Sequence, residues 1–186
     1  GGSPLNWQII NGEEYAGLSI LRMTTGIDDG PVVATDILKI QHETTIADLH
    51  VRANQTFSRM LLHVVSHLED SLNAAVEQDS GAACYWHQRS DADGQFDPAT
   101  ITTAALDRLV RGIGRPYPGA WANLETKRLR IFAVRKSEVN FRGTPGHIIK
   151  LKHHDPTVIL CDGSLDILDY EIAGSPQGLR NGMLLR

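Results

Sequence analysis

The sequence contains few cysteines and no long apolar run. Its 186 residues include two cysteines, Cys84 and Cys161, which stand far apart and match no zinc-ligand spacing. We therefore expect free thiols in a reducing compartment, a cytoplasmic protein and no bound metal. No stretch reaches the roughly 18 apolar residues that a membrane-spanning helix needs, and no signal peptide precedes the first predicted helix.

Positive charge is also scarce. The chain has 18 Lys and Arg against 22 Asp and Glu, which gives a formal net charge of −4, and the basic residues form no run. Proteins that bind nucleic acid normally concentrate positive charge on one surface, so this balance argues against a tRNA or DNA substrate. The hydrophobic content of 41% is nevertheless enough for a packed core and argues against global disorder.

Three segments have the sequence features of helices. A Ser-Pro pair begins a short helix at residues 3–12, because Ser is a common N-cap and Pro fits the first turn, and an Asn-Gly pair ends it. A capping box at residues 45–48 opens the longest helix, which we expect to end between residues 73 and 77. Its apolar face is predicted from residues at three- and four-residue steps: Ile46, Leu49, Ala53, Phe57, Met60, Leu61, Val64, Leu68 and Leu72. A third helix is predicted at residues 101–113, shortly before a proline at position 116.

Residues 18–38 predict a β-hairpin whose turn carries two carboxylates. Apolar, β-prone runs flank the turn, in which Asp28 and Asp29 stand between Gly26 and Gly30. We expect the glycines to supply the backbone angles that the turn requires, and Asp28 to point outward from the end of the strand pair. On spacing alone, ordinary turn chemistry is the more frequent explanation of such a segment.

From residue 120 onward the pattern changes to short strands separated by turns. The predicted strands cover residues 121–125, 128–134, 146–151, 157–161 and 165–172. Five short strands at this spacing favour a small barrel of the oligonucleotide/oligosaccharide-binding (OB) type. The polar stretch before the third helix predicts a linker, so we divide the chain into residues 1–78, a linker at 79–97, and a helix plus OB-like barrel at 98–186.

Three short motifs, in this order along the chain, resemble one enzyme family. They are PLNW at residues 4–7, GIDDG at residues 26–30 and RPYPGAW at residues 115–121. Together they resemble the formyltransferases that use 10-formyltetrahydrofolate. The pair Asn6-Trp7 is most similar to the enzymes that formylate an amino group on a nucleotide-linked sugar, whereas the branch acting on initiator tRNA tends to have Gln at position 6.

The resemblance covers nearly the whole chain and implies an α/β fold. Residues 1–78 would be the C-terminal half of a Rossmann-like formyltransferase domain, followed by the OB-like barrel. The family places a nucleotide-fold half in front, with most of a parallel sheet and a catalytic Asn and His, so we expect this chain to be a fragment of a longer protein. The family's catalytic Asp falls on Asp28, where it would orient the upstream His as a base.

The resemblance also implies binding residues. The backbone of Met23, Gly26, Ile27 and Asp28 would lie along the pterin of 10-formyltetrahydrofolate, while Asp29 is taken as a turn residue.

Three further residues are candidates for contacts with a nucleotide-linked amino sugar. Two prolines around Tyr117 fix the backbone and display one aromatic face, which could stack on a nucleobase, while Arg115 could pair with a pyrophosphate. The alternative is a rigid inter-domain corner with Tyr117 as a core residue, and both can hold together. Asn6 is the third candidate, with a solvent-facing side chain as its alternative; Trp7 is expected to pack against the hairpin.

The resulting prediction is a sugar N-formyltransferase that transfers a formyl group to a dTDP- or UDP-linked amino-deoxy sugar for polysaccharide biosynthesis. One alternative is a methionyl-tRNA formyltransferase, which would need a basic surface near the barrel. An alternative of another class is a non-catalytic OB-like module that binds nucleotides or carbohydrate. His63 and His67 lack a third metal ligand at a telling spacing, and the long helix or the barrel strands offer surfaces for a homodimer.

Overall fold

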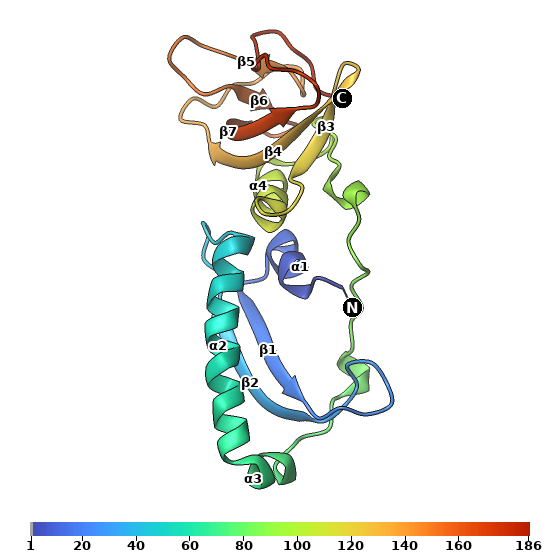
Figure 1. The fold of residues 1–186 in the computed structure, drawn as a ribbon. Coiled ribbons are helices and arrows are strands. Elements are labelled where there is room, and N and C mark those ends of the chain that lie inside the picture. Colours follow the sequence, from blue (N-terminus) through green and yellow to red (C-terminus); the bar gives the residue numbers. More distant parts are fainter. Residues whose placement is uncertain (1) are drawn as a thin grey trace.

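The computed structural model describes residues 2–186 as two units joined by a linker (Figure 1). The N-terminal unit contains α1 (Pro4–Asn11), β1 (Tyr15–Leu21), β2 (Val32–Lys39), α2 (Ile46–Ser66) and α3 (Leu68–Asn73). The C-terminal unit contains α4 (Thr103–Ile113), β3 (Ala120–Leu124), β4 (Lys127–Lys136), β5 (Ile148–Ile149), β6 (Thr157–Ile159) and β7 (Ser164–Ile172). The molecule is elongated, and α1 and α4 meet between the two units.

The N-terminal unit is built on the predicted hairpin. Strands β1 and β2 pair antiparallel, with Leu18 opposite Asp36 and a register shift at the end of β1. Helix α1 begins at the predicted proline, but Ser3 does not cap it as expected, because its backbone is left-handed (φ 53°) and its side chain makes no capping hydrogen bond. Gly12 ends the helix at φ 78°, as predicted.

Helix α2 confirms the predicted capping box and corrects the predicted helix end. The Asp48 amide donates to the Thr45 hydroxyl, and the Asp48 carboxylate accepts from the Thr45 amide at 3.0 Å. The Asp48 carboxylate also accepts from the Thr45 hydroxyl at 2.6 Å, and this bond together with the one from the Thr45 amide lowers the pKa of Asp48. The helix ends at Ser66 rather than at residues 73–77, because His67 leaves helical geometry (φ −130°, ψ 43°) and α3 starts after it.

Only part of the predicted apolar face of α2 is buried. Ile46, Leu49, Ala53 and Met60 of α2 pack under the hairpin in a core cluster with Ile9, Ala16, Leu18 and Leu38. Phe57, Leu61 and Leu68, which were predicted on the same face, are exposed. Among residues 2–186, no helix is both long and apolar enough to cross a membrane.

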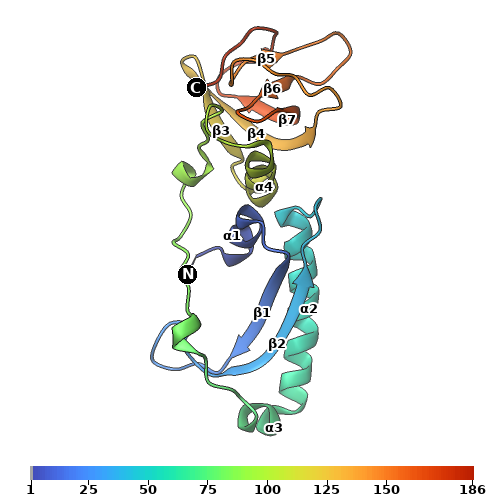
Figure 2. The same cartoon turned by 180° about the vertical axis from the view of Figure 1, so that it is seen from behind.

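The C-terminal unit is a five-stranded antiparallel sheet that packs against α4 (Figure 2). Its strand order is β3-β4-β7-β6-β5, and each of the five predicted strands is confirmed, although β5 has only two residues. The last residues of the chain form hydrogen bonds at both edges of this sheet, beside β3 and beside β5. Asn123 and Arg186 exchange two backbone hydrogen bonds of 2.8 Å, and the Leu185 amide donates to the Gly146 carbonyl at 2.8 Å. The sheet is therefore open in its strand order, and the final segment links its edges.

The two units meet where α1 lies against the end of α4. The buried Asn6 side chain donates to the Gly112 carbonyl at 2.8 Å, one of the last carbonyls of α4, which have no partner within the helix. Gly112 leaves room for α1, because a Cβ added at this position would lie 2.7 Å from Ile10 Cγ1. Glycine at this position lets the helices approach closely.

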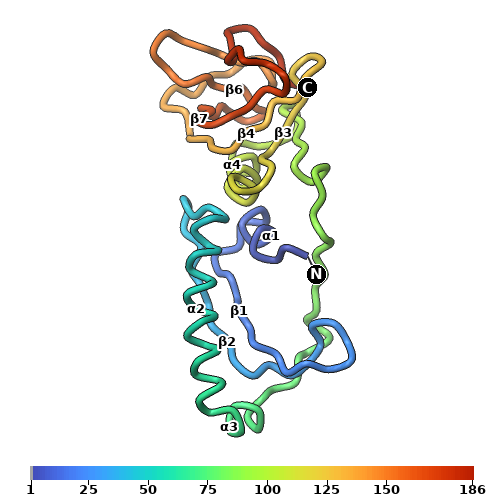
Figure 3. The backbone as a smooth tube through the Cα atoms, in the orientation of Figure 1, coloured from blue at the N-terminus to red at the C-terminus, as the bar shows by residue number. Residues whose placement is uncertain are grey.

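The linker follows one side of the molecule from the N-terminal to the C-terminal unit (Figure 3). It is irregular, as predicted, with short 3-10 helices at Ser80–Ala82 and Asp91–Gly94. In its middle the Gly2 amide donates to the Trp86 carbonyl at 3.0 Å. Near its end Asp91 accepts from Arg128 at 2.9 Å, so the linker is attached to both units.

We predict that Asn6→Ala destabilises the protein by about 1–3 kcal/mol, because it creates a small cavity and removes the donor from a buried carbonyl. Denaturant unfolding measures this change. The control is Asn54→Ala on the exposed surface of α2, which should stay within about 0.5 kcal/mol of the wild type. Equal stability of the two variants would show that the contact between the units contributes nothing.

Candidate functional site

The turn between β1 and β2 holds Asp28 in an unusual backbone conformation. Asp28 has φ 56°, a left-handed value that is uncommon for residues other than glycine. Gly26 and Gly30 do not have positive φ, which corrects the predicted reason for these glycines. Gly30 is needed for close approach, because a Cβ there would overlap the Arg22 backbone carbonyl oxygen. A Cβ on Gly26 would overlap only the Asp29 side-chain carboxylate, which would have to move.

Internal hydrogen bonds close this turn. The Arg22 amide donates to the Pro31 carbonyl at 2.9 Å, where the chain enters and leaves the turn. Inside it, the Thr24 hydroxyl donates to the Asp29 carboxylate. Asp29 therefore serves the turn itself, as predicted, while the neighbouring Asp28 is the carboxylate proposed for chemistry.

The turn is also held from outside by the chain just before the linker. Val76 and Val32 exchange two backbone hydrogen bonds of 2.8 and 3.0 Å. Two residues further on, the side-chain nitrogen Nε2 of Gln78 donates to the backbone carbonyl oxygens of Asp28 at 2.8 Å and Gly30 at 2.7 Å. Sequence patterns gave no sign of this contact, because it joins segments about 50 residues apart.

Two apolar side chains of the turn face solvent. Met23 is 94% exposed and Ile27 is 92% exposed. Surface apolar residues are common, but two in one tight turn beside Asp28 form a small apolar contact surface next to a carboxylate. Such a surface fits a flat heterocycle better than a highly charged ligand.

Tyr117 lies where the two units and the linker meet. Its hydroxyl is 2.9 Å from His50 Nε2 on α2, and its ring packs against both core clusters. The Arg89 guanidinium lies 5.4 Å from the ring centre, and burial lowers the pKa of Arg89. Tyr117 thus occupies the inter-domain corner that the sequence offered as one of two alternatives; stacking on a nucleobase stays a prediction.

Arg115 is engaged within the C-terminal unit. Its guanidinium donates to Asp169 at 2.9 Å and to Glu171 at 2.8 Å, and it lies 4.0 Å from the centre of the Phe132 ring. Hydrogen bonds with Asp169 and then Glu171 raise the pKa of Arg115. The predicted pairing with a pyrophosphate would have to compete with both carboxylates.

Asn6 and Trp7 lie on α1 but serve different contacts. Asn6 is 1% exposed and bonds to α4, so it does not face solvent, and its predicted contact with a substrate stays a prediction. Trp7 packs against the linker rather than the hairpin, which corrects the expectation. Its ring stacks on Trp86 with centroids 5.6 Å apart, and its Nε1–H donates to the His87 carbonyl at 3.1 Å.

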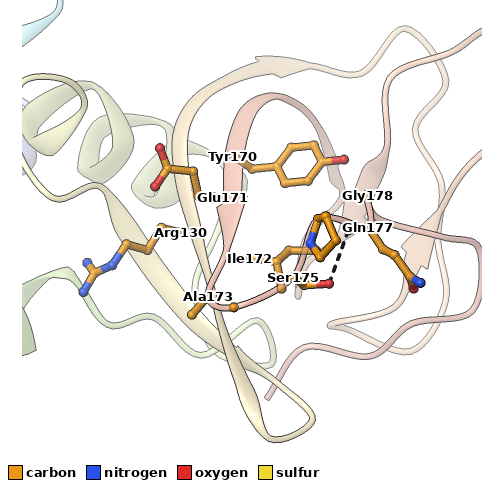
Figure 4. Close-up of a pocket in the computed structure, with 10 residues that line it drawn as sticks. Arg130, Tyr170, Glu171, Ile172, Ala173, Ser175, Gln177 and Gly178 are labelled. Atoms are coloured by element: carbon orange, nitrogen blue, oxygen red, sulfur yellow. Dashed lines mark hydrogen bonds between the residues drawn. The ribbon is translucent and has the colours of Figure 1, made fainter.

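Two cavities lie away from these residues. One cavity, of 550 Å³, lies along the end of β7 and the turn that follows it, and its lining includes Arg130, Tyr170 and Gln177. Figure 4 shows this turn, in which the Gln177 backbone amide donates to Ser175 Oγ at 3.3 Å. The other, of 890 Å³, is a groove between the units beside α4. Neither is lined by Asp28. Across residues 2–186, no three His, Cys, Asp or Glu side chains group as metal ligands.

Comparisons with known families account for this arrangement. Residues 1–65 match the formyl transferase family model, and residues 90–177 match the model of the formyl transferase C-terminal domain. The chain therefore belongs to the formyltransferase family. The Asp28 turn lies in the first match, and Arg115 and Tyr117 lie in the second.

Individual relatives agree with this family. The chain is 30% identical over 174 residues to a methionyl-tRNA formyltransferase of Citrifermentans bemidjiense, covering 94% of this chain and 54% of the relative. It spans about half the length of the curated relatives it matches, 54% and 47% for two of them.

Solved structures show the same fold at low identity. HypX from Aquifex aeolicus, in complex with tetrahydrofolic acid, has a TM-score of 0.71 and 20% identity, covering 89% of this chain and 29% of HypX. An N-formyltransferase from Helicobacter canadensis, in complex with folinic acid and dTDP-3-aminofucose, has a TM-score of 0.63 and 16% identity, covering 90% of this chain and 60% of that enzyme.

We predict that Gly30→Ala opens the turn, because the new Cβ would overlap a backbone oxygen that cannot move independently. Local destabilisation of about 1–3 kcal/mol would speed amide hydrogen exchange at residues 22–31 by roughly tenfold to a hundredfold. The control is Gly17→Ala on β1, where a Cβ meets nothing within 4 Å. Unchanged exchange in Gly30→Ala would contradict the close approach.

Proposed function

We propose that the full-length protein containing this chain transfers a formyl group from 10-formyltetrahydrofolate to the amine of a nucleotide-linked amino-deoxy sugar, in the cytoplasm. The observation that carries this proposal is the Asp28 turn. It lies in the part of the chain that matches the formyl transferase family, at the end of a rigid hairpin, and it is closed by its own hydrogen bonds. A rigid scaffold that presents one carboxylate in this way suits catalysis.

Asp28 would act through an imidazole. Formyl transfer needs a neutral amine, a stabilised oxyanion and removal of a proton. A carboxylate beside a histidine fixes the ring orientation and stabilises its protonated form, so that the histidine works as a base. We assign this positioning task to Asp28, with the His and an Asn supplied by the part of the protein outside this chain.

The turn also fits the folate co-substrate, which supplies the formyl group. Met23 and Ile27 offer exposed apolar contact beside Asp28, and Gly26 in the same turn is exposed as well. Structures of HypX and of the Helicobacter canadensis enzyme with folates support this assignment by their shared fold.

The acceptor is inferred from charge and from one motif. The net charge of the chain is −4. In the C-terminal unit, ion pairs with carboxylates already engage four arginines, Arg115, Arg128, Arg130 and Arg135. This leaves less positive charge for a polyanion such as tRNA. The Asn6-Trp7 pair and the dTDP-sugar complex of the Helicobacter canadensis enzyme favour a nucleotide-linked sugar.

Methionyl-tRNA formyltransferase is the second candidate, and a specific observation supports it. Curated relatives at 30% and 32% identity have that activity in their names. Titration of the full-length protein with dTDP- and UDP-linked amino sugars and with initiator tRNA separates the two. Tight tRNA binding that falls steeply with salt would replace the sugar with tRNA as acceptor.

We predict that Asp28→Asn lowers turnover of the full-length enzyme by about 10²–10⁴-fold, because it removes the charge that supports the base. Formyl transfer to an amino-sugar nucleotide measures the effect. The matched control is Asp29→Asn, whose amide oxygen can still accept from Thr24, and it should keep most activity. Full turnover in Asp28→Asn would refute the catalytic assignment.

A further inference from the structure

We propose that Gln78 is a positioning residue that holds Asp28 in its working orientation. This inference rests on the proposed function, since it assigns a supporting residue to the same turn. Gln78 does not belong to the hairpin and stands at the boundary between the N-terminal unit and the linker. It reaches back across 50 positions to bond with Asp28.

The geometry uses the full donor capacity of one amide. A glutamine side-chain nitrogen carries two hydrogens, and here they go to two carbonyls of the same turn. The Asp28 carbonyl accepts at 2.8 Å and the Gly30 carbonyl accepts at 2.7 Å. The two bonds bracket Asp29 and fix the orientation of the peptide groups that follow Asp28 and Gly30. They therefore restrict ψ of the residue whose φ is already left-handed.

The Gln78 backbone is itself held in place. Two residues earlier, Val76 pairs with Val32 at the start of β2, through hydrogen bonds in both directions. Val32 lies only two residues beyond Gly30, so the Gln78 side chain starts from a point fixed close to the turn. Further along, Trp86 stacks on Trp7 and keeps the linker against α1.

Anchoring of this kind matters because the turn is exposed to solvent. Most of its residues are exposed, and Met23 and Ile27 make almost no contact with the rest of the chain. A left-handed backbone is strained for a residue other than glycine, although less for Asp than for most, and contacts from outside the turn help to hold it. Catalytic groups lose much of their effect when displaced by about 1 Å, with rate losses on the order of a hundredfold. Gln78 adds a direct constraint from outside the hairpin, on the peptide groups that follow Asp28 and Gly30.

The first test replaces the donors and keeps the length of the side chain. In the full-length protein, Gln78→Met and the isosteric Gln78→Glu both remove the two N–H groups. We expect kcat to fall by roughly tenfold to a hundredfold, with KM for the amine acceptor changed by less than about threefold. Gln55→Met, at an exposed position on α2, is the control and should behave as the wild type.

A double-mutant cycle shows whether Gln78 acts through Asp28. If it does, Gln78→Met will cost little or nothing in an Asp28→Asn background, because the group it positions has lost its function. Multiplicative losses in the double variant would overturn the inference. Amide exchange at residues 22–31 supplies a readout that needs no activity: it should rise in Gln78→Met and stay unchanged in Gln55→Met.

The outcomes separate this inference from the proposed function. If Asp28→Asn is inactive while Gln78→Met keeps wild-type kcat or wild-type exchange, only the role of Gln78 is overturned. If the wild-type protein transfers no formyl group to any amine acceptor, or if Asp28→Asn is fully active, the proposed function fails and the catalytic role of Gln78 fails with it. Faster exchange together with lower kcat and a non-additive cycle supports the inference.

Discussion

The arrangement of the molecule depends on the contact between α1 and α4. Asn6 donates to the Gly112 carbonyl, and the absence of a side chain at Gly112 lets Ile10 approach α4 closely. Burying an amide and a helix-terminal carbonyl without this bond would cost free energy on both sides, so each helix supplies what the other needs. The contact joins the hairpin that carries Asp28 to the C-terminal unit that carries Tyr117.

The linker adds a second connection along the outside. It starts beside the Asp28 turn at Gln78, stacks on α1 through Trp86 and reaches the C-terminal sheet, where Asp91 pairs with Arg128. Its Arg89 guanidinium lies over Tyr117 on the way. An irregular segment with so many attachment points is not a flexible tether. It fixes the distance between the two units as the helices fix their contact.

Local signals were readable in the sequence, and long-range pairs were not. Three predicted features depend mainly on neighbouring residues. They are the capping box at Thr45, the glycine that ends α1 and the five strands of the C-terminal sheet. The end of α2 at Ser66 was missed. The partners of Trp7 were missed as well, because they lie about 80 residues further along the chain. For the site, the sequence identified the Asp28 turn but misjudged its glycines, since close approach to Arg22 depends on how the turn folds over itself.

Electrostatic pairing on the C-terminal sheet bears on the proposed acceptor. A phosphate that binds Arg115 would displace Asp169 or Glu171, exchanging one anion for another at an exposed site, where such pairs contribute little. Arg128 and Arg130 share Asp91, and Arg135 lies between Asp155 and Asp166, so the same argument applies to them. Affinity for a polyanion comes from many unpaired cations that release counterions, and these pairs reduce that contribution. A small acceptor with one phosphate-bearing group needs only one or two such contacts, and this favours the nucleotide-linked sugar over tRNA.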